Sequence, residues 1–213
     1  MISQSDDQVV VLGGSGIVAR YIQGVLSKSG HSVTVVGRKR PEMMEGFDWV
    51  ATTEFIQGKW ALPNGCVIIS LWNIGRLTQH LDILRNASQV IALSSTSALV
   101  KADSKELADR NLAKKLISGE EQLIEFSEIE NIPTTILRPT VIYDGVNDNS
   151  ICDIAALIKR TGFFVVAGRG SGKRQPIHAE DVCEMICRCI GHEKTYNTSF
   201  NIVGGSTITY REM

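Results

Sequence analysis

The sequence lacks the features that mark membrane, secreted and nucleic-acid-binding proteins. Its longest apolar runs, such as residues 66–72, have the length of a strand and are far too short to cross a membrane. The first residues, MISQSDDQ, have neither the basic nor the apolar region of a signal peptide. The net charge is −1, so no excess of positive charge draws the chain to nucleic acid or to an anionic membrane. We therefore expect a cytoplasmic protein without either partner.

Cysteine is scarce and shows no metal-binding spacing. The five cysteines are Cys66, Cys152, Cys183, Cys187 and Cys189. The last three fall on one predicted helix, with a spacing that matches no metal signature. We expect all five to be reduced packing residues, and we expect neither a disulfide nor a bound metal.

Short apolar runs alternate with amphipathic stretches through the first two thirds of the chain. Strands are predicted at 9–12, 33–36, 49–52, 66–71, 90–93 and 134–137, and helices at 17–29, 77–87 and 104–130. Because the strands are nearly all apolar, the pattern predicts a parallel sheet covered on both faces. The predicted fold class is α/β, a Rossmann-type doubly wound parallel sheet.

The pattern loosens after Pro139. Helices are predicted at 151–160 and 179–190, an extended segment at 163–166, a strand at 200–203, and the start of a helix in the final ITYREM. We expect residues 1–145 to form the dinucleotide-binding core. Residues 146–213 would form a small substrate-binding region, partial or truncated, that is interleaved with the Rossmann fold.

A glycine turn follows the first predicted strand and begins the first helix. It reads Gly13-Gly14-Ser15-Gly16-Ile17, with Ala19 two residues further on. Glycines at such a turn allow a sharp bend and a close approach to a pyrophosphate, and the small Ala19 lets the helix pack close to the sheet. The helix N-terminus then offers free N–H groups to the phosphates. A glycine-rich turn without a ligand is the alternative.

A basic cluster follows the second predicted strand. A site that prefers NAD usually has Asp or Glu here to bind the ribose 2′-hydroxyl, but this strand ends in Val36-Gly37-Arg38-Lys39-Arg40. The first acid after this strand is Glu42. Because Arg38 can pair with a 2′-phosphate, NADP is the predicted cofactor and NAD the second choice. A solvated basic turn is the alternative.

Five motifs occur in an order that is similar to a known family. They are VLGGSGIVA at 11–19, ALSSTS at 92–97, ILRPTVIYD at 136–144, RQPIHAEDV at 174–182 and FNIVGG at 200–205. The set resembles the extended and atypical short-chain dehydrogenase/reductases, which include NAD(P)-dependent sugar-nucleotide epimerases and dehydratases. The resemblance covers nearly the whole chain and implies a cofactor lying across the carboxyl ends of the strands.

The resemblance also implies roles for individual residues. Those implied to bind cofactor, in addition to the turn residues and Arg38, are Ser70, Leu71 and Trp72 on the adenosine side and Ser94, Pro139 and Thr140 on the nicotinamide side. Ser95 and Thr96 become candidates for orienting a substrate carbonyl, with local hydrogen bonding at a strand end as the alternative. Tyr143 is a further catalytic candidate, or else a packing residue. Asp181 and His178 are interpreted as structural, with Asp181 expected to cap the helix after it.

One departure from the family pattern concerns proton transfer. The family's usual pair is Tyr-x-x-x-Lys, in which the tyrosine acts as general acid and base and the lysine lowers its pKa. The matching positions hold Leu112 and Leu116, and no tyrosine occurs between Tyr21 and Tyr143. Lys114 and Lys115 lie nearby without a partner tyrosine. The standard machinery for hydride transfer is therefore absent or replaced.

A basic segment, KRTGFFVVAGRGSGKR, spans residues 159–174. Arg169, Lys173 and Arg174 are candidates for gripping the diphosphate of a substrate, and a solvated loop is the alternative.

Together these observations predict an NAD(P)-dependent epimerase- or dehydratase-like protein that acts on a nucleotide sugar or a related small carbonyl or hydroxyl compound. Two alternatives remain open: a non-catalytic NADP-binding sensor or scaffold, and an atypical NADPH reductase that uses Thr96 or a substrate hydroxyl. A homodimer is compatible with each of the three.

Overall fold

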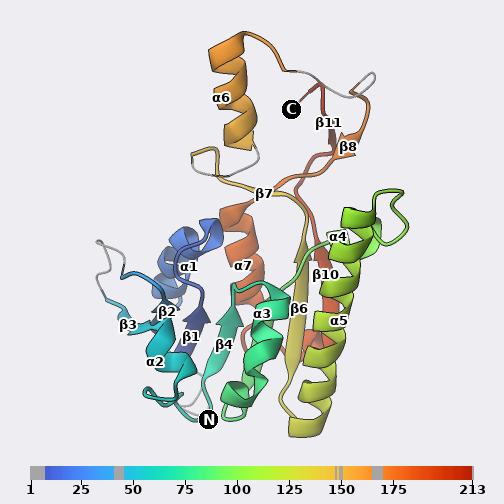
Figure 1. Cartoon of the computed structure of the whole chain (residues 1–213). Coiled ribbons are helices and arrows are strands. Elements are labelled where there is room, and N and C mark those ends of the chain that lie inside the picture. Colours follow the sequence, from blue (N-terminus) through green and yellow to red (C-terminus); the bar gives the residue numbers. More distant parts are fainter. Residues whose placement is uncertain (1–7, 41–45, 147, 149–150, 165–169, 213) are drawn as a thin grey trace.

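A computed structural model describes residues 8–40, 46–146, 148, 151–164 and 170–212. Its centre is a seven-stranded sheet with the strand order β10-β6-β5-β4-β1-β2-β3 (Figure 1). All neighbouring pairs are parallel. The strands are β1 (Gln8–Leu12), β2 (Ser32–Gly37), β3 (Asp48–Ala51), β4 (Val67–Ser70), β5 (Gln89–Leu93), β6 (Thr134–Pro139) and β10 (Thr198–Ile202).

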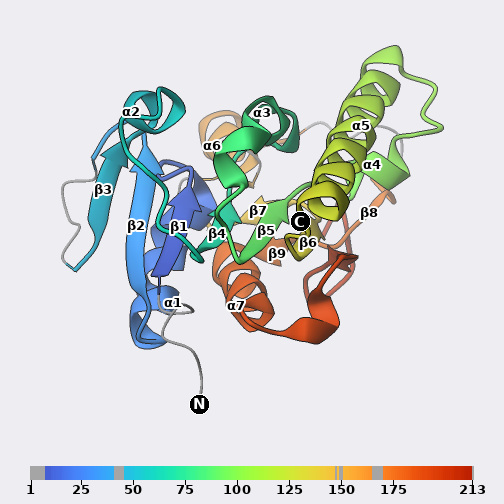
Figure 2. The same ribbon diagram turned by 90° about the horizontal axis from the view of Figure 1, so that it is seen from below.

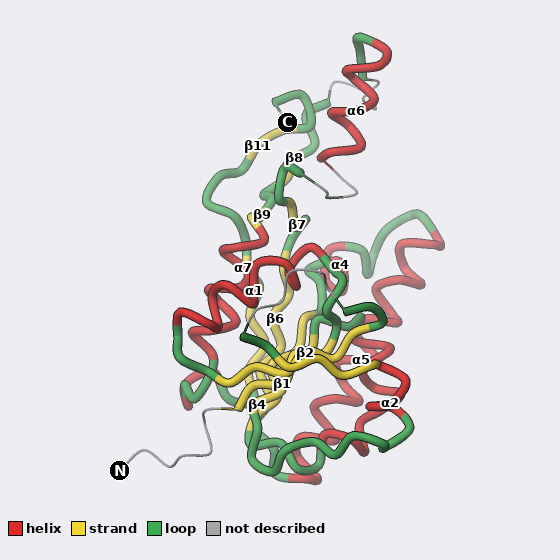
Figure 3. The backbone as a smooth tube through the Cα atoms, turned by 90° about the vertical axis from the view of Figure 1, so that its left-hand side faces the viewer, coloured by secondary structure: helices red, strands yellow, loops and turns green. Residues whose placement is uncertain are grey.

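Helices cover both faces of this sheet (Figures 2 and 3). On one face α1 (Ile17–Lys28) packs against α7 (Ala179–Cys189), above the β1 side chains Val9 and Val11. The other face carries α2 (Thr52–Ile56), α3 (Ile74–Leu77) and α5 (Leu107–Glu130), above Val10 and Leu12. Successive strand residues thus enter opposite apolar layers, as expected for a sheet buried on both sides. The prediction of a doubly wound α/β fold is confirmed.

A smaller region lies beyond the carboxyl ends of the strands (Figure 1). It contains β7 (Ile142–Tyr143) paired with β9 (Ile177–His178), β8 (Lys173–Arg174) paired with β11 (Ile208–Thr209), and α6 (Ile151–Thr161). The chain returns from it to the core through α7, a short 3₁₀ helix at Glu193–Thr195 and the edge strand β10. Residues after 146 therefore contribute both to this region and to the Rossmann core.

An acidic group holds the start of α6. The Asp148 carboxylate accepts hydrogen bonds from the N–H groups of Ile151 and Cys152. Asp144 pairs with Arg20 of α1 at 3.1 Å and accepts from the Val146 N–H at 2.9 Å. One oxygen of each carboxylate and the Cys152 sulfur lie within 4.8 Å of one another. The helix cap made by Asp148 and the ion pair made by Asp144 account for the positions of the two carboxylates.

The structure differs from the prediction in three places. The helix expected at 77–87 is α3 followed by a 3₁₀ helix at Thr78–Leu84, because Asn73 caps the chain earlier by accepting from the Gly75 N–H at 3.0 Å. The helix expected at 104–130 is confirmed as α5, whereas the short helix α4 (Ser97–Val100) before it was not predicted. Residues 208–212 are β11 and a turn, in which the Thr209 N–H donates to Glu212 at 2.8 Å and the Glu212 N–H donates to the Thr209 hydroxyl at 3.3 Å.

Two smaller predictions need a comment. His178, not Asp181, caps α7: the helix begins at Ala179, and the His178 Nδ1 accepts from the Glu180 N–H at 3.3 Å. The extended segment expected at 163–166 falls partly on residues outside the described ranges.

All five cysteines are free. Burial raises the pKa of the Cys66 thiol to about 12 and that of Cys187 to about 11. Within the described residues, no helix combines the length and the apolar character that a membrane span requires.

Candidate functional site

The glycine turn joins β1 to α1 at the carboxyl edge of the sheet. Gly13 has φ +110°, a conformation that side chains rarely adopt. A Cβ on Gly14 would lie 2.7 Å from the Val35 Cγ1 of β2. The N–H groups of Gly13 and Gly14 both donate to the Val36 carbonyl, at 2.9 and 3.3 Å. These two glycines are therefore required by the turn and by the packing of the chain itself.

Gly16 is different, because the fold does not require a glycine there. Its φ is −83°, which any residue adopts, and no atom lies within 4 Å of the position of an added Cβ. Gly16 is the N-cap of α1, and no side chain caps this helix end. The turn thus leaves open space in front of free helical N–H groups, which is the arrangement that binds anions.

Two cavities adjoin the glycine turn. We name them the arginine cavity, of about 260 Å³, and the leucine cavity, of about 310 Å³. The arginine cavity is lined by Gly13, Gly14, Ser15, Gly16, Arg38, Thr52, Leu71, Trp72, Asn73 and Arg76. The leucine cavity is lined by Gly16, Ile17, Val18, Ala19, Leu71, Trp72, Asn73, Ile74, Leu93, Ser94, Ser95, Ser97, Leu112, Leu116, Pro139 and Ile142. Because Gly16, Leu71, Trp72 and Asn73 line both, the cavities meet at the turn.

The arginine cavity is positively charged. Arg38 and Arg76 are its charged lining residues, and none of the described residues that line it is an acid. The Arg76 guanidinium lies 4.3 Å from the ring centroid of Trp72, in a cation–π contact. The sequence prediction included Arg38 and Trp72 but missed Arg76, Thr52 and Asn73. An asparagine shortly after a strand is a typical helix cap, so Asn73 could have indicated from the sequence that α3 begins here.

The leucine cavity is apolar. Leu112 and Leu116 of α5 line it beside Ser94, Ser95 and Pro139, so the positions matched to the family's Tyr and Lys do face this cavity. Leu116 is buried and Leu112 is partly exposed. No charged side chain lines the cavity among the residues that the structure describes. Its polar side chains are hydroxyls and the Asn73 amide, none of which is a useful general base near neutral pH.

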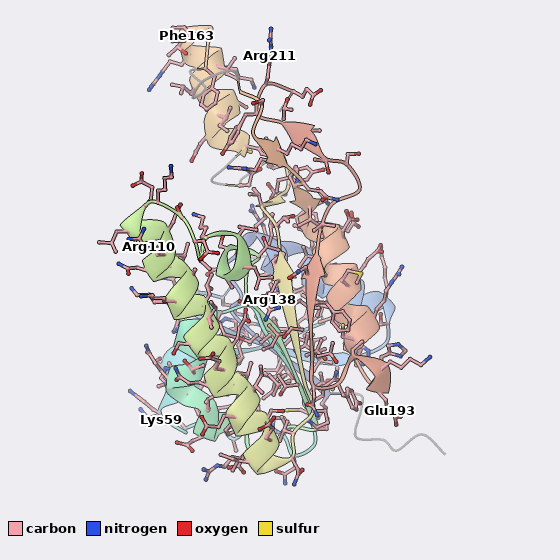
Figure 4. The ribbon with its side chains drawn as sticks, turned by 90° about the vertical axis from the view of Figure 1, so that its right-hand side faces the viewer. Lys59, Arg110, Arg138, Phe163, Glu193 and Arg211 are labelled. Carbon is pink, nitrogen blue, oxygen red and sulfur yellow. The ribbon has the colours of Figure 1, made fainter. Side chains whose placement is uncertain are left out.

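A buried ion pair supports one of these hydroxyls. Ser94 donates a hydrogen bond to Glu120 Oε1, and Arg138 Nε donates to both Glu120 oxygens at 3.0 and 2.9 Å. Figure 4 shows Arg138 on β6 beside α5. The hydrogen bond to Glu120 raises the pKa of Arg138, so the guanidinium stays charged. With its proton directed to Glu120, the Ser94 oxygen is left to accept hydrogen bonds from a ligand.

Four of the residues predicted for cofactor binding or catalysis line neither cavity. Ser70 is fully buried at the end of β4. Thr96 donates to the Pro139 carbonyl at 3.2 Å, and Thr140 donates to the Gln175 carbonyl. The Tyr143 ring packs edge-on against His178, with ring centroids 5.3 Å apart.

The predicted diphosphate grip is only partly described. Lys173 and Arg174 lie exposed on β8, in the region beyond the sheet. The Arg174 guanidinium lies 4.5 Å from the ring centroid of Tyr210 and donates to its hydroxyl at 3.1 Å. Arg169 falls outside the described residues.

Comparisons with known proteins support the fold. No family model matches the chain, and no curated protein matches it by sequence. Among solved structures, UDP-glucose 4-epimerase from Thermotoga maritima, with UDP-glucose, has a TM-score of 0.75 at 18% identity and covers 96% of this chain and 79% of its own. UDP-glucuronic acid 4-epimerase from Bacillus cereus, in complex with UDP-glucuronic acid and NAD, has a TM-score of 0.77 at 15% identity, with coverage of 96% and 80%. WbmF from Bordetella bronchiseptica, in complex with NAD⁺, has a TM-score of 0.72 at 16% identity, with coverage of 96% and 75%. This chain therefore has the fold of NAD-dependent sugar-nucleotide epimerases.

Proposed function

We propose that the chain binds a nicotinamide dinucleotide across the carboxyl ends of its strands. The pyrophosphate lies at the N-terminus of α1, the adenosine half in the arginine cavity and the nicotinamide half in the leucine cavity. The observation that carries this proposal is Gly16, because neither its backbone conformation nor its packing requires a glycine. The solved structures of the same fold with NAD or NAD⁺ bound support it.

NADP is the preferred cofactor in this proposal. Arg38 and Arg76 line the same cavity and both are suited to bind a ribose 2′-phosphate through charge-assisted hydrogen bonds. Arg76 is held against Trp72, so less conformational freedom is lost when it binds the phosphate. An NAD-selective site needs a carboxylate near the 2′-hydroxyl, and the described lining of this cavity offers none.

The activity belongs, in our proposal, to the NAD(P)-dependent epimerase- and dehydratase-like class, with a nucleotide sugar or a related small carbonyl compound as substrate. Leu112 and Leu116 favour a second candidate, a non-catalytic NADP-binding sensor or scaffold, since neither leucine can transfer a proton. An atypical reductase would instead rely on Ser95 to orient the carbonyl, because Thr96 is turned to the Pro139 carbonyl. The homodimer and the cytoplasmic location stay predictions.

Isothermal titration calorimetry with NADP⁺ and NAD⁺ tests the site. Gly16→Val fills the open space in front of α1, and we expect it to abolish binding of both cofactors. Gly24→Val is the matched control, because Gly24 lies exposed on the same helix and a Cβ there also meets nothing within 4 Å. Unchanged affinity in a folded Gly16→Val protein would contradict the proposed site.

Arg38→Ala tests the choice of cofactor. Hydrogen bonds to charged groups contribute about 1.5–3 kcal/mol, which corresponds to roughly 10- to 150-fold in affinity. We expect a loss of this size for NADP⁺ and almost none for NAD⁺. Arg40→Ala, an exposed arginine two residues away that does not line the cavity, is the control. Equal losses for both cofactors, or tighter binding of NAD⁺ by the native chain, would exclude this role for Arg38.

A further inference from the structure

The leucine cavity contrasts with the arginine cavity in charge. Apolar side chains, among them Leu71, Leu112 and Leu116, make up most of its lining, and its described lining contains no ionisable group. The arginine cavity next to it carries two guanidinium groups. A ligand that spans both cavities therefore places one end among positive charges and the other among hydrocarbon and hydroxyl groups.

The nearest buried carboxylate does not give the leucine cavity a negative potential. Glu120 lies behind Ser94 and is 4% exposed. Both of its oxygens are engaged by the Arg138 guanidinium, so the pair is neutral as a unit. The N-terminus of α1 borders the cavity at Gly16 and Ile17 and adds the positive end of a helix dipole. The surroundings thus disfavour a cation more than a neutral group.

The two redox forms of a nicotinamide cofactor differ in this respect. The oxidised ring carries a positive charge, whereas the dihydronicotinamide ring is neutral. Moving an unpaired charge out of water is unfavourable, and apolar walls compensate only the neutral ring. We propose that the leucine cavity makes this protein selective for the reduced cofactor, so that NADPH binds more tightly than NADP⁺. The inference rests on the proposed function, because it requires the nicotinamide ring to lie in this cavity.

Such selectivity makes the site a reader of the NADPH to NADP⁺ ratio. The adenosine half is the same in both forms and supplies affinity through Arg38 and Arg76. The difference in affinity between NADPH and NADP⁺ comes from the contact of the nicotinamide ring with the apolar wall of the leucine cavity. The fraction of protein with bound cofactor then follows the redox state of the cofactor pool. No chemical step is needed, and Leu112 and Leu116 could not assist one by proton transfer.

The test is calorimetry of the native chain with NADPH, NADP⁺ and adenosine 2′,5′-bisphosphate, which carries the 2′-phosphate but no nicotinamide. We expect NADPH to bind about tenfold or more tightly than NADP⁺, which corresponds to about 1.4 kcal/mol or more. The bisphosphate is expected to bind by itself, through the arginine cavity. Binding of the bisphosphate with equal affinities for the two dinucleotides, or tighter NADP⁺, overturns the inference and leaves the proposed function intact. If none of the three ligands binds, the proposed function fails and the inference fails with it.

A charge placed in the cavity provides the second arm. Leu112 is 38% exposed, so a polar side chain there leaves the core packed. Leu112→Glu puts a carboxylate beside the ring, and Leu112→Gln is the neutral control of nearly the same shape. We expect Leu112→Glu to lower the ratio of NADPH to NADP⁺ affinity by about tenfold, through attraction of the cationic ring. The Gln variant should keep the native preference. An identical ratio in both variants would overturn the electrostatic origin of the selectivity.

Discussion

Glu120 is a single residue that holds two neighbouring side chains, Ser94 and Arg138. It is 4% exposed and its carboxylate binds both the Ser94 hydroxyl and the Arg138 guanidinium. A buried ion pair is costly to break, since removing one partner leaves the other charge uncompensated. The orientation of Ser94 at the leucine cavity therefore depends on a residue that lines neither cavity.

Replacing Glu120 with Gln tests how much the buried ion pair contributes to stability. We expect a loss of about 3 kcal/mol in the free energy of unfolding, at the lower end for buried pairs because the Arg138 side chain is 18% exposed. Denaturant unfolding followed by circular dichroism measures it. Glu121→Gln is the control, since Glu121 is the exposed neighbour on the same helix. Equal stability of the two variants would show that the pair is energetically neutral.

Individual site residues could be predicted where a local motif constrains them. The glycines of the turn, Arg38, Leu71, Trp72 and Ser94 occupy strand ends, and parallel strands bring their carboxyl ends to one edge. Arg76 and Thr52 were missed because they lie on short helices without a motif and reach the site only through the tertiary fold. Thr96 and Thr140 were predicted from position, but hydroxyls at strand ends often bond to nearby backbone instead.

At the level of elements, α1 is positioned by glycine at its beginning. Gly14 lets the turn pass directly over Val35 of β2, a residue that is fully buried. Gly24, in the middle of the same helix, is exposed and has open space around it. The two glycines therefore have opposite effects on stability, although both belong to the turn-and-helix unit.

Alanine substitutions separate these effects. Gly14→Ala forces a Cβ within 2.7 Å of the Val35 Cγ1, and we expect it to destabilise the protein by about 1–3 kcal/mol, as overpacking does. Gly24→Ala should stabilise it by about 0.5–1 kcal/mol, because alanine loses less backbone freedom in a helix. Thermal unfolding of both variants gives the two signs. A neutral Gly14→Ala variant would mean that α1 shifts freely over the sheet.

The strands and the long helices were predicted more accurately than the short helical segments. Buried apolar runs give β1, β2, β4, β5 and β6 a clear pattern, and the structure has each within a residue or two of its expected position. The short segments depend instead on single hydrogen bonds, and Asn73 begins α3 earlier than expected. The predicted beginning of α7 at Ala179 is confirmed, but the residue that caps it is His178. Such side-chain bonds leave no periodic signal in the sequence.

At the level of the whole molecule, the fold combines a basic cavity beside the glycine turn with an apolar cavity. We propose that the glycine turn, the helix end and the two arginines bind a dinucleotide. The fold class followed from the alternation of strands and helices. The leucine cavity could not be foreseen in this form. Leu112 and Leu116 could be aligned with the family's catalytic pair, but only the structure shows both lining a cavity with Ser94 and Ser95.

Because leucines line the leucine cavity at 112 and 116, we expect little carbinol dehydrogenase activity in the native chain. Substitutions at these two positions should introduce such activity. General acid–base catalysis usually contributes about 10²–10⁴-fold, and neither leucine can supply it. Combining Leu112→Tyr with Leu116→Lys places a proton-transfer pair in a cavity that already has the hydroxyls. We expect turnover to rise by about 10²-fold and to gain a pH dependence set by the new tyrosine. A panel of sugar nucleotides and small carbonyl compounds with NADPH, followed at the nicotinamide absorbance, measures it.

The matched control is Leu112→Phe combined with Leu116→Met, which changes shape in a similar way but adds no ionisable group. It should bind NADPH and remain as inactive as the native chain. Fast turnover by the native chain, with a steep alkaline limb, would reveal a proton-transfer group outside the leucine cavity, and Tyr143 would be the first to replace. If the native chain binds NADPH tightly and turns over nothing, the sensor becomes the better description, because occupancy is then the only response that the site can give to the cofactor.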